Sequence, residues 1–375
     1  MIGALAGCTQ AAVPAAAEAA RPFVVHPVAS FSTPWAMAFL TGSGRPLLDA
    51  ALVTEKEGRL WLVETRPGSK IAVSGGPTVH VAGQGGLGDV AVHPGFVVNR
   101  RVYLSFVEAG PRGTSGAALG YGTLDLADRA HPALRGFKVI WRQSPKVEGD
   151  GHFSHRIAFG PDGYLYLTSG ERQKFTPAQD TTVKLGKVLR LTDEGAPTPG
   201  NPWASRGGVA ASFWTIGHRN LLGLSFAPDG RLWESEMGPK GGDEINLILP
   251  GRNYGWPNAS NGSNYDGSDI PDHRPGDGYE PPKVFWNPSI SPGAMMIYSG
   301  GQFPQWQGDA LVGALSGEAL IRVDITGDRA RKADEWPMGA RIRAVDEGPG
   351  GSVFLLEDEG RLLRLDPRPH TARRR

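Results

Sequence analysis

The chain has 375 residues, of which 53 are glycine and 31 are proline, and 40% of its residues are hydrophobic. This composition predicts a folded domain with many turns and few long helices, and it excludes an intrinsically disordered chain. A formal net charge of +1 gives no long-range attraction for nucleic acid. No apolar run reaches the roughly 20 residues that a membrane-spanning helix needs.

Residues 1–21 are predicted to be a leader and linker. Cys8, the single cysteine, ends the string Leu-Ala-Gly-Cys, which resembles the lipobox of bacterial lipoproteins, where the cysteine is lipidated and becomes the mature N-terminus. We therefore expect an exported, periplasmic protein with a lipid anchor at Cys8. The segment before Cys8 is short and lacks the basic region of a secretory signal, which leaves an accidental match as the alternative. Residues 369–375 are expected to be a solvated basic tail.

A phrase consisting of a turn and a short alternating apolar strand recurs six times between these ends. The six phrases contain Gly58, Arg101, Gly163, Gly230, Gly308 and Gly351. Intervals of roughly 40 to 80 residues between such units are typical of an irregular β-propeller. We therefore predict one all-β domain over residues 22–368, a six-bladed β-propeller of four-stranded antiparallel sheets, with a pair of β-sandwiches as the alternative. Residues 360–365 are expected to pair with residues 23–28 and so remove an exposed sheet edge.

Two polar positions in the first half could carry chemistry. Gln84 lies in the glycine-rich string GQGGLGDVAVHP, where the backbone can approach a ligand closely, although a glycine-rich turn explains the string equally simply. His152 lies just before a predicted strand and could act as a general base, because an imidazole titrates near neutral pH. His155 competes for the same role.

The stretch 212–257 alternates short strand-like runs with polar clusters, and we expect these clusters to gather at one mouth of the fold. Arg219 and Asn220 could hold a carboxylate or carbonyl oxygen, or Arg219 could be structural. Gly238 with Pro239, followed by Asp243 and Glu244, offers carbonyl and carboxylate oxygens of the kind that calcium prefers, without the spacing of an EF-hand.

Arg341 and Arg343 stand two residues apart in a segment that reads as extended, so both side chains are predicted to project from one face. Two neighbouring cations repel each other unless an anion lies between them, which favours a multiply anionic ligand. A solvated strand face is an equal alternative.

Several long strings, in the right order from about Phe31 to Pro367, resemble the soluble pyrroloquinoline quinone (PQQ)-dependent sugar dehydrogenases, the glucose/sorbosone or aldose sugar dehydrogenase family. The strings are GQGGLGDVAVHPGF, HFSHRIAFGPDGYLYLTSGE, LGKVLRL with PGNPW, IGHRNLLGLSFAPDGRLWESEMGP, GGDEINLILPGRNYGWP, PSISPGAMMIYSG and ARIRAV. The resemblance implies a six-bladed propeller that oxidises aldose sugars to lactones, with PQQ and calcium as cofactors and an electron acceptor that the sequence does not identify.

The resemblance also implies roles for the residues at the reacting end of the cofactor. His152 would remove the proton from the anomeric hydroxyl while hydride passes to PQQ. Gln84 would lie close to His152, and Arg219 and Asn220 would contact the quinone oxygens and stabilise developing negative charge.

Further roles concern charge. The resemblance places calcium on the carbonyls of Gly238 and Pro239, where it would polarise the quinone carbonyl. A second, structural calcium would be held by Glu244 with the carbonyl of Tyr254. Arg341 and Arg343 match positions that pair with the cofactor's carboxylates.

The chain departs from the family pattern at three points. A lysine that can bind a PQQ carboxylate is replaced by Ser316, which predicts weaker binding of the anion there, and His155 stands where a small residue is usual. Much of the substrate-shaping insertion of the glucose-specific members is absent, so we expect broad use of aldoses. A calcium-dependent propeller lactonase and a non-catalytic glycan- or protein-binding propeller are the rival functions.

Overall fold

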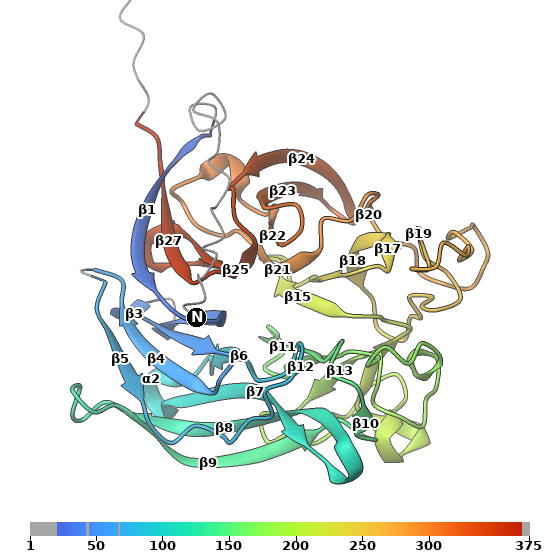
Figure 1. Cartoon of the computed structure of the whole chain (residues 1–375), viewed down its shortest axis with the longest axis horizontal. Coiled ribbons are helices and arrows are strands. Elements are labelled where there is room, and N and C mark those ends of the chain that lie inside the picture. Colours follow the sequence, from blue (N-terminus) through green and yellow to red (C-terminus); the bar gives the residue numbers. More distant parts are fainter. Residues whose placement is uncertain (1–20, 43–44, 67, 370–375) are drawn as a thin grey trace, which may run out of the picture.

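The computed structural model describes residues 21–42, 45–66 and 68–369, and it shows six antiparallel sheets arranged as blades around a central axis (Figure 1). The predicted all-β propeller is therefore confirmed. Each of the six recurring phrases contributes a strand to a different blade, because a turn followed by alternating apolar residues specifies a strand with one face toward each neighbouring blade. Cys8 and most of the expected leader and tail lie outside the described residues, so those boundaries stay predictions.

The blades follow one another along the chain. Blade 1 contains β2 (Pro34–Gly42), β3 (Arg45–Glu55), β4 (Arg59–Glu64) and β5 (Lys70–Val73). Blade 2 contains β6 (Leu87–Val92), β7 (Arg101–Ala109), β8 (Thr114–Asp125), β9 (Ala133–Arg142) and β10 (Val147–Glu148), the last two both pairing with β8. Blade 3 contains β11 (Ser154–Phe159), β12 (Leu165–Ser169), β13 (Lys187–Leu191) and β14 (Phe213–Ile216).

The second half repeats the pattern. Blade 4 contains β15 (Leu221–Phe226), β16 (Leu232–Glu236), β18 (Asp243–Ile248) and β20 (Val284–Trp286), with the small pair β17 (Lys240–Gly241) and β19 (Gly262–Ser263) beside it. Blade 5 contains β21 (Pro292–Ile297), β22 (Ala310–Ala314), β23 (Ala319–Thr326) and β24 (Arg329–Pro337). Blade 6 contains β25 (Ile342–Glu347), β26 (Val353–Glu357), β27 (Arg361–Pro367) and β1 (Phe23–Ser30).

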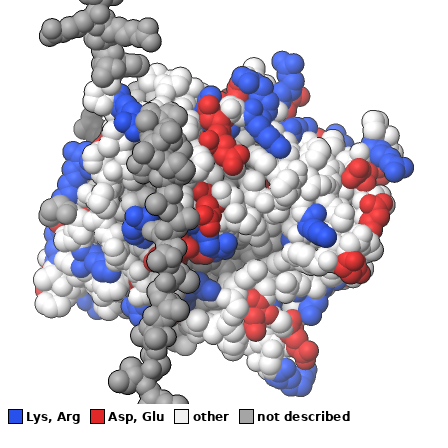
Figure 2. Space-filling model, turned by 45° about the horizontal axis from the view of Figure 1, so that its top comes forward, with Lys and Arg blue, Asp and Glu red and all other residues white. Residues whose placement is uncertain are grey.

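Helices are short, as the composition predicts. In the part of the chain that the structure describes, the α-helical segment is α2 (Phe96–Asn99), and the 3-10 turns are η1 (Pro111–Gly113), η2 (Thr176–Ala178), η3 (Ala204–Arg206), η4 (Gly208–Ser212), η5 (Pro304–Trp306) and η6 (Pro349–Gly351). None of the described helices is long and apolar enough to cross a bilayer. On the visible part of the face in Figure 2, acidic and basic side chains are interspersed, in keeping with the small net charge.

The ring closes between its first and last strands. β1 pairs antiparallel with β27, with Phe23 opposite Pro367 and Ser30 opposite Arg361, so strands from the two ends of the domain lie side by side (Figure 1). The predicted closure is confirmed. It completes blade 6 as a four-stranded sheet and removes the edge that β27 would otherwise expose.

The hydrophobic core lies between the blades. Buried side chains of blades 1 and 2 form one cluster, those of blades 2 and 3 another, and those of blades 4 and 5 a third. Because each sheet buries both faces against its neighbours, the axis itself is lined only by the innermost strands β2, β6, β11, β15, β21 and β25, which contact one another around the ring.

Every one of these six inner strands carries an irregular register close to its first residue, at Pro34/Ala36, Leu87/Val90, Ser154/Ile157, Leu221/Gly223, Pro292/Ala294 and Ile342/Ala344. A β-bulge turns a side chain out of the alternating pattern and is common next to active sites. These six irregularities lie at one end of the axis, and those of β2, β11, β15 and β25 direct side chains toward one mouth.

Candidate active site

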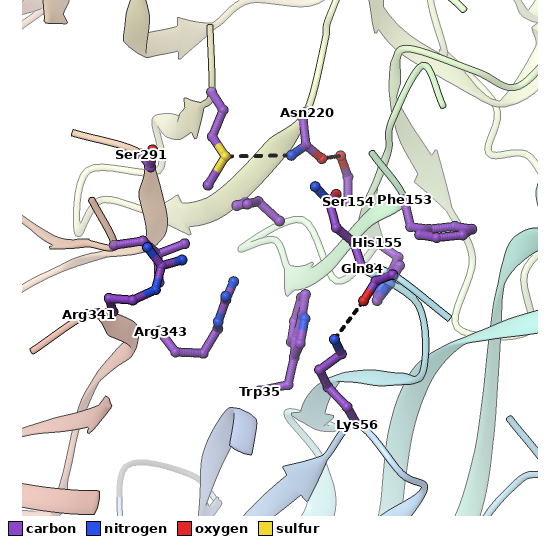
Figure 3. Close-up of a pocket in the computed structure, with 14 residues that line it drawn as sticks. Trp35, Lys56, Gln84, Phe153, Ser154, His155, Asn220, Ser291, Arg341 and Arg343 are labelled. Carbon is purple, nitrogen blue, oxygen red and sulfur yellow. Dashed lines mark hydrogen bonds between the residues drawn. The ribbon is translucent and has the colours of Figure 1, made fainter. Parts of the chain in front are cut away.

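A cavity of about 260 Å³ occupies this mouth, and it is lined by residues of the other five blades and of the connection that leads into blade 2 (Figure 3). Trp35, Leu222 and Arg343 come from the bulges of β2, β15 and β25, and His155 comes from the irregular start of β11. The strand irregularities thus build the cavity wall. The prediction that loops of separate blades meet at one mouth agrees with this arrangement.

One wall of the cavity contains two stacked rings. The imidazole of His155 lies 5.1 Å from the Trp35 ring at an interplanar angle of 19°, and its Nδ1 is 2.8 Å from the hydroxyl of Ser105. Burial lowers the pKa of His155 to about 3, so this imidazole is neutral at physiological pH. Gly88 makes room for it, because a Cβ at Gly88 would lie 1.9 Å from its Cε1. His155 is therefore part of the cavity wall, and no carboxylate of the described residues orients it as a base would require.

A second part of the wall, next to Trp35, is cationic. Arg341 and Arg343 both line the cavity, and their Nε atoms donate to the two carboxylate oxygens of Asp358 at 2.9 and 2.8 Å. Burial opposes ionisation of Asp358, but the two guanidinium groups hold its pKa below the usual value. A protein carboxylate therefore already lies between the two arginines. Lys56 lines the cavity from blade 1 and donates to the carbonyl of Gly83 at 2.7 Å, so the lining holds three cationic side chains, two of which are bonded to Asp358.

His152 lies beside this cavity and is tied to it by Gln84. The backbone N–H of His152 donates to Oε1 of the exposed Gln84, which lines the cavity, at 2.8 Å. Nδ1 of His152 lies 2.5 Å from Oε1 of Glu171, and both side chains are buried. An imidazole oriented by a carboxylate through Nδ1 has Nε2 available to exchange a proton. Of the two histidines, His152 therefore has the geometry of a base.

Burial lowers the pKa of His152 below the ordinary imidazole value, although the hydrogen bond to Glu171 opposes this shift. Burial opposes ionisation of Glu171, but its hydrogen bond to His152, together with the N–H of Phe175 and the nearby positive charges, holds the pKa of its carboxyl below the usual value. The result is a neutral imidazole beside an ionised carboxylate. Glu171 also accepts the backbone N–H groups of Gln173, Lys174 and Phe175 at 2.9, 2.5 and 2.6 Å, which fixes the loop that follows β12.

Arg219 and Asn220 end the segment before β15 and face the gap between blades 3 and 4. The guanidinium of Arg219 donates to the carbonyls of Met237 and Gly238 at 2.9 and 2.7 Å and to the hydroxyl of Tyr265 at 3.2 Å, and its buried Nε has no hydrogen-bond partner among the described residues. The amide nitrogen of Asn220 has only a 3.8 Å contact to the sulfur of Met237. Both residues therefore keep hydrogen-bond donors for a ligand oxygen.

A much smaller second cavity, about 10 Å³, adjoins the first across Met237, which lines both. Its lining includes four residues predicted for the calcium and cofactor sites, namely Arg219, Gly238, Glu244 and Tyr254. Pro239 is buried next to Gly238 in the turn before β17 and lines neither cavity.

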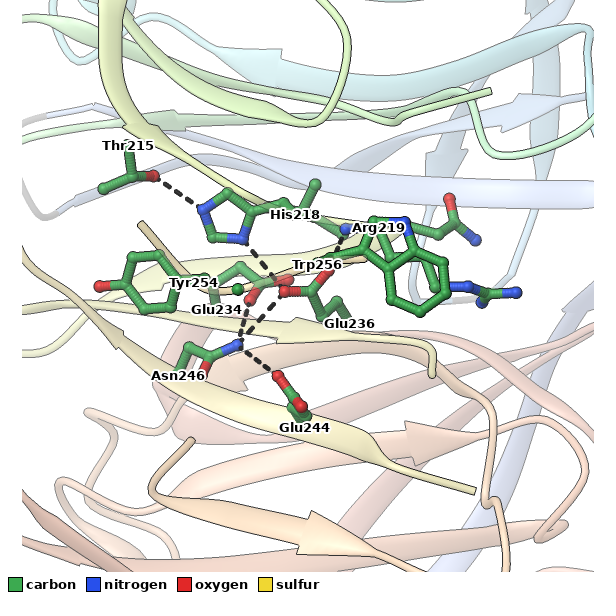
Figure 4. A network of polar contacts seen from close by, with 12 residues as sticks. Thr215, His218, Arg219, Glu234, Glu236, Glu244, Asn246, Tyr254 and Trp256 are labelled. Atoms are coloured by element: carbon green, nitrogen blue, oxygen red, sulfur yellow. Dashed lines mark hydrogen bonds and ion pairs between the residues drawn. The ribbon is translucent and has the colours of Figure 1, made fainter. Parts of the chain in front are cut away.

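Three buried glutamates converge next to this second cavity. Asn246 donates its side-chain amide to Glu234, Glu236 and Glu244 at 3.2, 3.4 and 3.4 Å, and His218 Nδ1 lies 3.0 Å from Glu236 (Figure 4). The alternation of β16 and β18 places the four side chains on one face, since Glu234 pairs with Asn246 and Glu236 with Glu244.

This cluster has too many acceptors for its donors. Burial, reinforced by the charge of Glu236, raises the pKa of Glu234 and of Glu244 well above the usual value. Within the described part of the chain, Glu234 Oε1 and Asn246 Oδ1 have no hydrogen-bond partner although both are buried. Carboxylate and amide oxygens without hydrogen-bond partners are the ligands that a hard cation such as calcium prefers. A lactonase would need its carboxylates in the central channel. These three lie within blade 4, away from the axis, which disfavours that rival function.

The structure thus brings most of the predicted residues to one mouth. The first cavity has Gln84, Asn220, Arg341 and Arg343 in its lining, the second has Arg219, Gly238, Glu244 and Tyr254, and His152 is bonded to Gln84. Sequence reasoning missed Lys56, Glu171 and Asp358. Glu171 carries a readable signal, because it is a carboxylate that directly follows a predicted strand at the same mouth.

Comparisons with known proteins identify the family of the chain. The family model described as glucose/sorbosone dehydrogenase matches residues 31–364. The aldose sugar dehydrogenase YliI of Escherichia coli is 39% identical over 345 residues, covering 89% of this chain and 90% of that protein. The apo-form structure of the soluble aldose sugar dehydrogenase of E. coli has a TM-score of 0.86 at 37% identity, covering 92% of this chain and all of that one. A PQQ-bound aldose sugar dehydrogenase of Streptomyces coelicolor has a TM-score of 0.75 at 28% identity, covering 92% and 98%.

Proposed function

Because the chain belongs to the glucose/sorbosone dehydrogenase family, we propose that it is an aldose sugar dehydrogenase that uses PQQ and calcium to oxidise the anomeric carbon of an aldose to a lactone. The observation that carries the proposal is the buried His152–Glu171 pair beside a cavity lined by three cations. That pairing supplies a base and an anion-binding wall in one mouth.

The cavity fits a flat polyanion. Lys56, Arg341 and Arg343 outnumber the single carboxylate of Asp358, which leaves net positive charge for the three carboxylates of PQQ. The planar Trp35 and neutral His155 add an apolar wall without a competing charge. When bound, PQQ supplies the two-electron acceptor that takes hydride from the anomeric carbon. Ser316, at the position of the family's lysine, bonds to Ser291 at the cavity edge, and Lys56 provides a cation from the opposite side.

His152 acts as the base in this proposal. With Nδ1 held by Glu171, Nε2 takes the proton of the anomeric hydroxyl, and the electron pair left on oxygen forms the lactone carbonyl as hydride leaves the carbon. Gln84 fixes the backbone of His152, and Arg219 and Asn220 present N–H donors to oxygen atoms that gain negative charge. The lowered pKa keeps His152 unprotonated and ready to accept a proton near neutral pH.

Calcium completes the site in two places. The carbonyls of Gly238 and Pro239 would hold the ion next to the cofactor, and because Arg219 already donates to Gly238, we propose that this guanidinium turns toward the quinone oxygens when the ion binds. Glu244 with the carbonyl of Tyr254 would hold a second, structural ion. The unpartnered oxygens of Glu234 and Asn246 support a cation near Glu244.

Reconstitution tests the proposal directly. Purified apo-protein is incubated with PQQ and calcium, and dye reduction is followed with several aldoses, since we expect broad use of sugars. We expect activity that requires both cofactors and that falls at least about 100-fold in His152→Ala, the effect of removing a general base. Full dye reduction by His152→Ala would overturn the assignment of His152 as the base. A reconstituted wild type without activity would overturn the proposed dehydrogenase function.

Export is a separate proposal that rests on the string ending at Cys8, which lies outside the described residues. We propose a periplasmic protein that is lipidated at Cys8. Labelling of cells with a radioactive fatty acid should label the wild type and leave Cys8→Ser unlabelled. Equal absence of label in both proteins would remove the lipid anchor from the proposal.

A further inference from the structure

We propose that Phe175 is a specificity-determining residue whose exposed ring packs against the nonpolar C–H face of the sugar. The inference rests on the proposed dehydrogenase function. It starts from the backbone of the loop after β12, where Arg172, Gln173 and Phe175 have φ angles of 64°, 57° and 62°. For Phe175 the ψ angle is −84°, so this bulky residue lies outside the ordinary left-handed region.

Such a conformation is unfavourable and persists only where the surroundings enforce it. Glu171 enforces it by accepting the N–H groups of Gln173, Lys174 and Phe175. The fully buried Arg172 side chain adds donors to the carbonyls of Gly151 and Ser115 at 2.9 and 2.6 Å. A loop held this firmly presents its exposed side chain in a fixed position.

The Phe175 ring has the wrong environment for a structural residue. It is 45% exposed, and it stacks at 5.5 Å and 27° on Trp256, which is 5% exposed. Burying the ring completely would stabilise the protein, so strain combined with exposure points to a ligand. An aromatic face fixed next to a polar site is suited to a ring that is apolar on one side and polar at its edge.

Phe175 is linked to the reacting groups through two neighbours, Glu171 and Trp256. Glu171 binds the N–H of Phe175 with one carboxylate oxygen and His152 with the other. The ring on which Phe175 stacks, Trp256, has the guanidinium of Arg219 5.1 Å from its centroid. A platform connected to both the base and Arg219 can hold a sugar whose anomeric hydroxyl reaches His152. A sugar is therefore favoured over an occupant that binds away from the base.

Glycine at position 175 separates this role from a structural one. Phe175→Gly removes the ring and also removes the backbone strain, because glycine adopts positive φ without cost. We expect a melting temperature equal to or above that of the wild type, with KM for glucose, xylose and maltose raised about three- to tenfold and kcat within about twofold, the effect of losing one aromatic contact. Phe175→Tyr, which keeps an aromatic ring, should have the KM values of the wild type.

Phe285 provides a matched control: it is 44% exposed and lies on the outer strand β20, and neither phenylalanine is in a cavity lining, but only Phe175 contacts Glu171 and Trp256. Phe285→Ala should leave all sugar constants unchanged. An unchanged sugar KM in Phe175→Gly would overturn the inference, and so would a raised KM for the dye alone, which would assign the ring to the electron acceptor. If the wild type oxidises no aldose, the proposed function fails first, and saturation-transfer NMR of the apo-protein with the same sugars still tests whether Phe175 contacts them.

Discussion

Glu171 offers the sharpest test of the base, because it touches His152 and lies away from both cavity linings. In Glu171→Gln the charge is lost and the neutral amide can still accept from Nδ1. A hydrogen bond to a charged group contributes about 1.5–3 kcal/mol, and one pKa unit corresponds to about 1.4 kcal/mol. Both groups are buried, so screening by water does not reduce this figure much. The pKa of His152 should therefore fall by about one to two units.

The sign of the pH effect follows from the role of the group. A base works only when unprotonated, and burial already holds the pKa of His152 below about 6.5. The acid limb of kcat/KM should therefore lie below this value in the wild type and move lower by about one to two pH units in Glu171→Gln. Because the base is weaker and less well oriented, the plateau should fall about 10- to 100-fold.

The measurement is a pH profile of kcat/KM for glucose with saturating PQQ, calcium and dye. Glu171→Gln also places an NH2 group against the N–H groups of Lys174 and Phe175, so a lower melting temperature is expected. A structural effect would not move the acid limb, and Glu108→Gln, at an ion pair with Arg142 in blade 2, controls for loss of a carboxylate elsewhere. An acid limb that stays in place or moves to higher pH would refute the reasoning.

Three further predictions concern the walls and the cation sites. The double variant Arg341→Ala, Arg343→Ala should weaken PQQ binding at least about 100-fold in a fluorescence titration. Of the two single variants, Arg343→Ala should weaken binding more than Arg341→Ala, because the Arg343 side chain is 16% exposed against 40% for Arg341. A PQQ affinity equal to that of the wild type would remove both residues from the cofactor site. Calcium chelation should lower the melting temperature of the wild type, and Glu234→Gln should reduce that shift; a shift of the same size would place the structural ion elsewhere. Gly88→Ala should lower the free energy of unfolding by about 1–3 kcal/mol, because the added Cβ would collide with His155. Adding His155→Ala to this variant should recover part of the loss, as measured by chemical denaturation. If the effects of the two substitutions simply add, the contact between positions 88 and 155 does not limit packing.

The fold could be predicted from the sequence because its signal is local. Each blade needs a turn and an alternating strand, and both are visible within about ten residues. Closure was also predictable, since the apolar strand at 360–365 needs a partner and the segment at 23–28 can supply one. The bulges at the inner strands were not, because a bulge is defined by the register of two strands and a single strand does not reveal it.

The site was predictable only in its ligand-facing half. Arg341 and Arg343 indicated an anion between them, but the anion found in the structure is Asp358, which belongs to the connection after β26. Lys56 lies in a hairpin turn and has the sequence context of an ordinary exposed lysine. Residues that orient other residues act through contacts between segments distant in the chain, and a single sequence does not record those contacts.

Strained backbone is concentrated at this mouth, and Gln173 shows how to separate strain that supports the loop from strain that serves the ligand. Of the ten non-glycine residues with positive φ among those described, three lie in 152–155 and three in 172–175. The side chain of Gln173 is exposed, and its φ is 57°. Gln173→Gly should relieve about 1–2 kcal/mol of backbone strain and lose about 0.5–1 kcal/mol through the greater freedom of the unfolded chain. We therefore expect a small gain in stability with unchanged KM and kcat, whereas Phe175→Gly should raise KM. If both glycine variants alter KM equally, loop rigidity sets sugar affinity and the Phe175 ring does not.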